Sequence, residues 1–178
     1  ISDKVHPILV DSLRGMGATV DYHPKMAYLD VKNIISNYQG VIVNSKVICD
    51  QSFINSALHL DFIGRLGSGL DIIDLPYAAQ KGIEVISSPE GNANAVAEHA
   101  MGMLLSLMHN LGNSHEEVRK QEWNREPNRG EELKGKTIGI IGFGHTGPAF
   151  GKKLSSFDIT ILAFDKYKED LSSRAPYI

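Results

Sequence analysis

Short apolar runs alternate with stretches of helical apolar spacing along most of the chain. Residues 41–43 and 83–86 are β-branched runs bounded by turn residues, which is typical of strands covered on both faces. Between such runs, apolar residues recur at helical spacing, as over residues 51–58. Strands that alternate with helices predict a parallel sheet and an α/β fold. The elements predicted before residue 90 are helices over 6–13, 33–38, 51–58 and 75–81 and strands over 18–22, 41–43, 61–67 and 83–86.

The middle of the chain holds a candidate boundary and a long apolar helix. Residues 87–91 (SSPEG) form the best candidate linker, so we expect two lobes, 1–90 and 91–178. Residues 93–120 predict one helix with apolar side chains on nearly every face, which must be buried all round. A small lobe can hardly cover such a helix, which favours a subunit or domain interface; the alternative is a central core helix. Residues 121–134 are polar and predict a loop.

A glycine-rich turn follows the most apolar strand of the second half. Residues 136–143 predict this strand, which runs into Gly142, Gly144 and Gly147 in the pattern G-x-G-x-x-G, with a helix after them. The first glycine permits the tight turn, the second lets the backbone approach a pyrophosphate, and the third lets helix and strand pack closely. The N-terminus of the helix supplies N–H donors and partial positive charge. The turn therefore predicts a dinucleotide site, in which His145 and Thr146 also lie.

An acidic residue stands where such a site needs one. Asp165 ends the next predicted strand, 159–164, and lies 18 residues after Gly147 (165 − 147 = 18), close to the usual separation of about 20. A carboxylate there accepts hydrogen bonds from ribose hydroxyls and repels a 2′-phosphate, which favours NAD over NADP. Its neighbour Lys166 weakens that preference.

Two alternatives compete with a dinucleotide site in this part of the chain. A glycine-rich turn can be only a tight strand-to-helix connection, but the ordered strand, helix, second strand and acidic residue favour binding. Residues 130–137 (GEELKGKT) match the Walker A pattern, yet they follow a polar loop and open a strand, whereas a P-loop follows a strand and opens a helix. We therefore interpret that match as coincidental and leave ATP hydrolysis as a minor alternative.

Composition narrows the class of protein. With 18 Lys and Arg against 21 Asp and Glu, the net charge of −3 disfavours nucleic-acid binding. Cys49 is the single cysteine, which excludes an intrachain disulfide and fits a reducing compartment. The sequence contains neither a long apolar span nor a secretory signal, so we expect a cytoplasmic protein with no membrane contact. It has no initiator Met, and Ile1 resembles the end of a strand, so we expect a truncated start.

Taken together, these residues resemble the D-isomer-specific 2-hydroxyacid dehydrogenase family. The resemblance implies a flavodoxin-like substrate lobe over 1–90 and the first half of a Rossmann NAD-binding domain over 91–178. It implies that Gly67, Ser68 and Gly69 offer N–H groups to the carboxylate of a 2-hydroxy acid. The matching stretches, in the family's order, are 64–74 (GRLGSGLDIID), 91–99 (GNANAVAEH), 123–125 (WNR), 132–137 (ELKGKT) and 142–147 (GFGHTG).

The resemblance also places further substrate residues and a partner. Asn44 and Ser45 lie in the substrate segment, and Asn92 lies near the cleft between the lobes. Asn44 stands where one branch of the family usually carries an arginine that meets the substrate. The long helix over 93–120 implies a homodimer.

The family's catalytic arginine, its carboxylate partner and its histidine all lie beyond the end of this chain. We therefore expect an incomplete dehydrogenase with no catalytic residue of its own. The alternatives are a non-catalytic NAD sensor or corepressor of the same fold, and a dimerising scaffold that binds nothing.

The remaining polar residues have simpler interpretations. Asp71 and Asp74 are expected to be turn and cap residues, with Gly82 ending the helix that Asp74 begins. Arg65 is expected to form a structural ion pair, and His99 and His109 to pack within the apolar helix. The histidines show no metal-ligand spacing.

Overall fold

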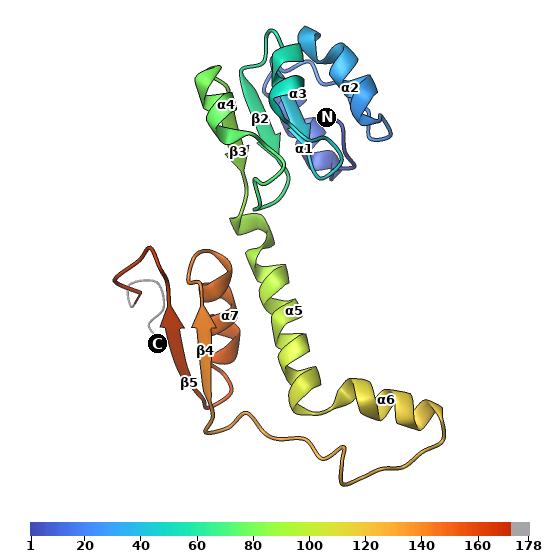
Figure 1. Ribbon diagram of the computed structural model, residues 1–178, viewed down its shortest axis with the longest axis vertical. Coiled ribbons are helices and arrows are strands. Elements are labelled where there is room, and N and C mark those ends of the chain that lie inside the picture. The colour runs from blue at the N-terminus through green and yellow to red at the C-terminus, as the bar shows by residue number, and fades with distance from the viewer. Residues whose placement is uncertain (172–178) are drawn as a thin grey trace. The chain divides into compact units, whose positions relative to one another are not determined.

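A computed structural model describes residues 1–171, and the chain divides into two compact units, Ile1–Pro89 and Glu90–Ile178 (Figure 1). Both units alternate helices with parallel strands, so the predicted α/β fold class is confirmed. Within the described residues, no helix is long and apolar enough to cross a membrane.

The first unit is built on a three-stranded parallel sheet in the order β1-β2-β3. Its core lies between the sheet and the helices, and Val43 and Ile63 are fully buried there. In chain order its elements are α1 (Pro7–Gly15), α2 (Tyr28–Ile34), the 3-10 turn η1 (Ile35–Asn37), β1 (Gly40–Val43), α3 (Gln51–Ser56), β2 (Phe62–Arg65), α4 (Leu75–Gln80) and β3 (Glu84–Ser87).

Local signals predicted the ends of α4 correctly. The carboxylate of Asp74 accepts a hydrogen bond from the Tyr77 N–H at 3.0 Å, and Gly82 after the helix has φ +74°. Asp50 caps α3 in the same way, through the Phe53 N–H at 2.8 Å. These caps fix where the helices begin relative to the strands.

Two strand predictions in this unit need correction. Residues 18–22 form no strand; instead the Asp21 carbonyl accepts from the Ile1 amine and the His23 N–H donates to the Ile1 carbonyl, both at 2.9 Å. That pairing is too short to count as a ladder. β3 is present at one edge of the sheet but is not covered on both faces, since Ile86 is 49% exposed.

The second unit places two parallel strands beside packed helices. α5 lies against α7, and Met101 and Leu104 of α5 pack on a core that includes Phe143 and Leu154. The elements are α5 (Glu90–Met108), α6 (Leu111–Arg119), β4 (Thr137–Ile141), α7 (Thr146–Leu154) and β5 (Thr160–Phe164).

The single helix predicted over 93–120 is two helices. The chain breaks at Asn110, whose φ of 50° lies in the left-handed region that asparagine tolerates better than most residues. The loop that follows α6 returns to the break, where the Glu131 N–H donates to the Met108 carbonyl at 2.9 Å. That bond satisfies one of the carbonyls left open at a helix end.

The described part of the unit does not bury this helix all round, which agrees with the expectation that a small lobe can hardly cover it. Of the α5 side chains, only Ala93 and Ala97 are buried, whereas Met103 is 56% and Leu107 75% exposed. An apolar face of α5 is therefore left uncovered by the described part of the unit.

Candidate functional site

The glycine turn lies at the carboxyl end of β4, and its three glycines occupy different structural environments. Gly142 has φ +92°, which side-chain-bearing residues rarely adopt, and its N–H donates to the Phe164 carbonyl at 2.7 Å. A Cβ on Gly147 would overlap the carbonyl oxygen of Gly142, so α7 can pack this close to the turn only without one. A Cβ on Gly144 would meet no atom of residues 1–171 within 4 Å. The turn thus keeps open space at its middle glycine.

Asp165 faces this turn from the end of β5. Its Oδ2 accepts a hydrogen bond from the Phe143 N–H at 2.7 Å, and its Oδ1 accepts one from the Tyr167 N–H at 2.9 Å. β4 and β5 are neighbouring parallel strands, so their carboxyl ends meet at the same edge. A carboxylate offers about four acceptor sites, and these two backbone N–H groups occupy one on each oxygen.

Sequence reasoning missed Lys168 at this corner. Its Nζ donates to the Phe143 carbonyl at 3.0 Å, so Asp165 and Lys168 together hold both sides of residue 143. The only sequence signal was a lysine shortly after the acidic residue, which does not show where its flexible side chain points.

The other predicted residues of the turn lie around it. His145 is half exposed, and its Nδ1 lies 3.3 Å from Oε1 of Glu90, a partner that the sequence did not indicate. Thr146 begins α7, and the N-cap residue His145 makes no capping hydrogen bond with its side chain. Lys166 is exposed, and its Nζ lies 5.5 Å from the ring centre of Tyr167. The corner is therefore a set of backbone N–H groups with charged side chains at its rim.

The predicted substrate residues of the first unit also come together. β1 and β2 are paired so that Val43 lies beside Arg65, which brings Asn44 and Ser45 next to the turn of Gly67, Ser68 and Gly69. Gly67 has φ +143°, and a Cβ on it would overlap Nη1 of Arg65. Asn92 lies in the first turn of α5, exposed, in the second unit.

Arg65 does not form the ion pair expected of it. Its Nη1 donates to Oδ1 of Asn44 at 2.9 Å and to the Leu66 carbonyl, which are both neutral oxygens. Arg65 is the last residue of β2, and its guanidinium lies against Gly67 of the glycine turn. The acceptors that it meets there are a side-chain amide and a backbone carbonyl. The charge of the guanidinium is therefore not cancelled by any carboxylate paired with it among the described residues.

The remaining candidate residues are the helix histidines, the Walker-like stretch and possible metal ligands. His99 and His109 are both exposed and do not pack within an apolar helix: His99 lies on α5, and His109 lies in the turn after α5, against Gly130. The lysine of the Walker-like stretch, Lys136, pairs with Glu131 at 2.7 Å and leads into β4, as expected for a coincidental match. In the described part of the chain, no group of three His, Cys, Asp or Glu residues could hold a metal ion.

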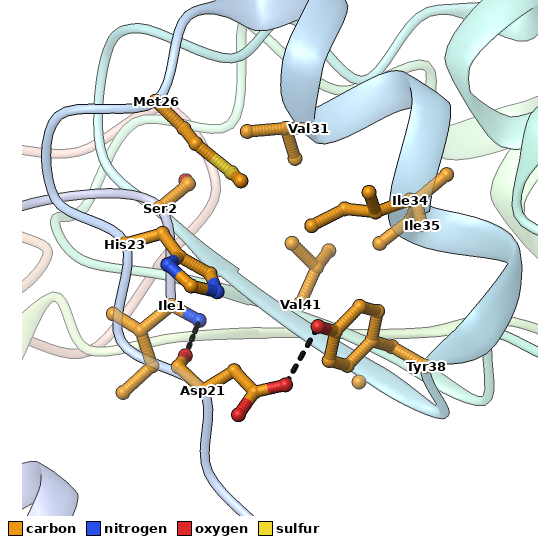
Figure 2. A pocket seen from close by; sticks show the side chains of 11 residues that line it. Ile1, Ser2, Asp21, His23, Met26, Val31, Ile34, Ile35, Tyr38 and Val41 are labelled. Carbon is orange, nitrogen blue, oxygen red and sulfur yellow. Dashed lines mark hydrogen bonds between the residues drawn. The ribbon is translucent and has the colours of Figure 1, made fainter.

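The first unit also contains a small apolar pocket that sequence reasoning did not find (Figure 2). It lies at the amino end of β1, whereas Asn44 and the glycine turn lie at the carboxyl end. The Tyr38 hydroxyl donates to the Asp21 carboxylate at 2.7 Å beside it, and this bond raises the pKa of Tyr38. The space open to water is about 30 Å³, roughly one water molecule, so the pocket cannot hold a substrate.

Comparison with known proteins gives a consistent family. A family model described as D-isomer specific 2-hydroxyacid dehydrogenase, catalytic domain, matches residues 1–174. The chain is 30% identical over 94% of its length to D-3-phosphoglycerate dehydrogenase of Archaeoglobus fulgidus, and 32% identical over 84% to hydroxypyruvate reductase of Thermotoga maritima. The solved structure of NAD-dependent formate dehydrogenase from Staphylococcus aureus in complex with NAD superposes with a TM-score of 0.78, at 27% identity over 90% of this chain.

These matches cover only part of each relative. The chain spans 32% of the Archaeoglobus protein, 49% of the Thermotoga protein and 50% of the Staphylococcus chain.

Proposed function

The chain belongs to the D-isomer-specific 2-hydroxyacid dehydrogenase family, and from that premise we propose that it is part of an enzyme that transfers hydride between a 2-hydroxy acid and NAD. Because it spans about a third to a half of its relatives, hydride transfer is proposed for the whole protein and not for this chain alone. Relatives named D-3-phosphoglycerate dehydrogenase support 3-phosphoglycerate as the substrate, and with it a role in serine biosynthesis. The buried thiol of Cys49 fits a reducing compartment such as the cytoplasm.

The open space at Gly144 is the observation that carries the cofactor proposal. It lies between the N-terminus of α7 and the strand end, where N–H donors and helix dipole favour a pyrophosphate. Gly142, Gly144 and Gly147 would hold the pyrophosphate, with His145 and Thr146 beside it. Asp165 would accept from the ribose hydroxyls, and Lys166 lies at the rim. Bound there, NAD supplies the hydride acceptor.

In the first unit, the turn of Gly67, Ser68 and Gly69 would bind the substrate carboxylate. A glycine turn with backbone N–H groups suits an anion, and Gly67 permits the backbone conformation that the turn needs. Asn44 and Ser45 lie beside the turn and would orient the substrate. Asn92, on α5 of the second unit, is the remaining substrate residue that we propose.

We also propose a homodimer formed through the helical residues 93–120. The support is the uncovered apolar surface of this segment, where large side chains that would otherwise meet water lie on both α5 and α6. Its exposed members are Val96, Met103, Leu107, Leu111 and Val118.

Calorimetric titration with NAD tests the cofactor site. We expect weak but measurable binding to the wild-type chain and none to Gly144→Val, because the added side chain fills the pyrophosphate space. Gly139→Val is the matched control: it makes the same change in β4, where a Cβ also meets no atom within 4 Å, and it should bind as wild type does. Equal titrations for Gly144→Val and wild type would overturn the proposal.

A further inference from the structure

Asn44 is held in place by a buried carboxylate. Asp3 is 5% exposed, and its Oδ2 accepts a hydrogen bond from the Asn44 N–H at 2.7 Å. The other oxygen of Asp3 lies 3.6 Å from Nζ of Lys46, which also donates to the Ser2 carbonyl at 2.8 Å. The backbone of residue 44 therefore has a fixed position at the end of β1.

The side chain of Asn44 in turn holds Arg65. Its Oδ1 accepts from Nη1 of Arg65 at 2.9 Å, and the same nitrogen donates to the Leu66 carbonyl. Within residues 1–171, Nε of Arg65 is buried and has no hydrogen-bond partner. The guanidinium lies directly against Gly67, whose missing side chain leaves the room for it. Two contacts to neutral oxygens thus fix a cation beneath the turn.

The neutrality of those contacts has an electrostatic consequence. Arginine stays protonated in proteins, so the guanidinium keeps its full charge. An aspartate at position 44 would hold Arg65 equally well but would cancel its charge, and an alanine would leave only the Leu66 carbonyl as its acceptor. Asn44 combines an acceptor oxygen with zero net charge. The carboxylate nearest to the other end of the turn is that of Asp71, which is exposed and lies against Gly69.

We propose that Asn44 is a positioning residue that holds Arg65 beneath the turn of residues 67–69 without neutralising it, so that the charge of Arg65 acts together with the N–H groups of the turn on the substrate's anionic group. The proposal rests on the assignment of this turn to the substrate. What it adds is the connection from Asp3 through Asn44 to Arg65, and a reason for an amide at position 44.

NMR of the ¹⁵N-labelled full chain measures two effects separately: the positioning of Arg65 by Asn44, and the contribution of the Arg65 charge to anion binding. The Nε–Hε signal of Arg65 reports whether the side chain is fixed, and titration with D-glycerate, read at the Gly67 and Gly69 amides, reports anion binding. We expect Asn44→Ala to make the Arg65 signal mobile and to weaken glycerate about tenfold, since a hydrogen bond to a charged group contributes about 1.5–3 kcal/mol. Asn44→Asp should leave Arg65 fixed and still weaken glycerate.

The control is Asn55→Asp, the same charge change at an exposed site of the same unit, where the Tyr77 hydroxyl keeps its acceptor. It should change neither reading. If the Nε–Hε signal shows the Arg65 side chain to be equally immobile in wild type and in Asn44→Ala, the proposal that Asn44 positions Arg65 is overturned. Unchanged glycerate affinity in Asn44→Asp would overturn the role of the charge. If glycerate shifts no amide of the wild-type turn, the substrate assignment falls with the proposal, whereas the NAD titration of Gly144→Val still tests the cofactor site separately.

Discussion

The N–H of Phe143 donates a 2.7 Å hydrogen bond to the carboxylate of Asp165, 22 residues further along the chain. This bond ties the ends of β4 and β5 together at the glycine turn. Asp165 therefore contributes to the shape of the turn before any ligand arrives, in addition to the ribose contact proposed for it.

Asp165→Asn should separate these two contributions. The amide oxygen can still accept from Phe143, but the negative charge that repels a 2′-phosphate is gone. We expect NAD binding to weaken about tenfold, the loss of one charge-assisted hydrogen bond, and the preference for NAD over NADP to disappear. Titrations with both nucleotides measure this. Glu169→Gln, an exposed neighbour with the same charge change, should keep the preference; an intact preference in Asp165→Asn would contradict the proposed contact.

Gly147→Ala should destabilise the second unit by about 2 kcal/mol, because the new Cβ overlaps the Gly142 carbonyl and forces α7 away from the turn. Gly102→Ala on α5 is the matched control, since a Cβ there meets no atom within 4 Å and alanine favours the helix. Urea unfolding followed by circular dichroism compares the two variants. Equal midpoints for Gly147→Ala and wild type would show that the helix can shift without cost.

Cys49 should be unreactive in the folded chain. Its side chain is fully buried, and burial, with a smaller contribution from Asp50, raises the pKa of the thiol to about 12. At pH 8 only about one thiol in ten thousand is then ionised, and only the thiolate attacks a disulfide reagent. Labelling with an aromatic disulfide reagent should therefore follow unfolding of the first unit and speed up with added urea. Complete labelling within the mixing time in native buffer would contradict this expectation.

The bond between Tyr38 and Asp21 should make the first unit sensitive to alkaline pH. Folding raises the pKa of Tyr38, mainly through this hydrogen bond, so the stabilisation is complete below pH 10, the usual tyrosine value, and is lost as pH rises through the folded pKa. Tyr38→Phe should lose about 0.5 kcal/mol at pH 7 and show a shallower decline above pH 10. Urea midpoints at pH 7, 9 and 10.5 test it. Tyr167→Phe, at an exposed ring, should behave as wild type; the same slope in all three proteins would be the contrary result.

Leu107→Glu should convert a dimer into a monomer. Leu107 is 75% exposed on α5, and a carboxylate at the centre of an apolar interface would be desolvated without a partner. Leu58→Glu changes an equally exposed leucine, at 74%, in the first unit and should leave the mass unchanged. Analytical ultracentrifugation gives the masses. A monomeric wild type at 100 μM or a dimeric Leu107→Glu would contradict the proposed interface.

The sequence predicted those features that are determined by neighbouring residues. The turn at Gly142 and the cap by Asp74 both follow from local spacing, and both are present in the structure. The parallel sheets also followed, because strands separated by helices can pair in few other ways.

What the sequence could not predict depends on contacts between distant residues. The partner of Arg65 is Asn44, 21 residues away, and a guanidinium gives no local sign of choosing an amide over a carboxylate. The break at Asn110 depends on a loop that returns to Met108 from residue 131, which no helical pattern within 93–120 reveals. Lys168 reaches the glycine turn only because it follows β5, which lies beside β4.

The three glycines of the turn would respond differently if the protein ever lost its nucleotide. Gly142 and Gly147 are required by backbone conformation and by helix packing, so natural selection for a folded chain would retain both. Gly144 has room for a side chain, and only a ligand in that space would keep it a glycine. In descendants of this chain that no longer bind the nucleotide, we therefore expect substitutions at Gly144 before substitutions at Gly142 or Gly147.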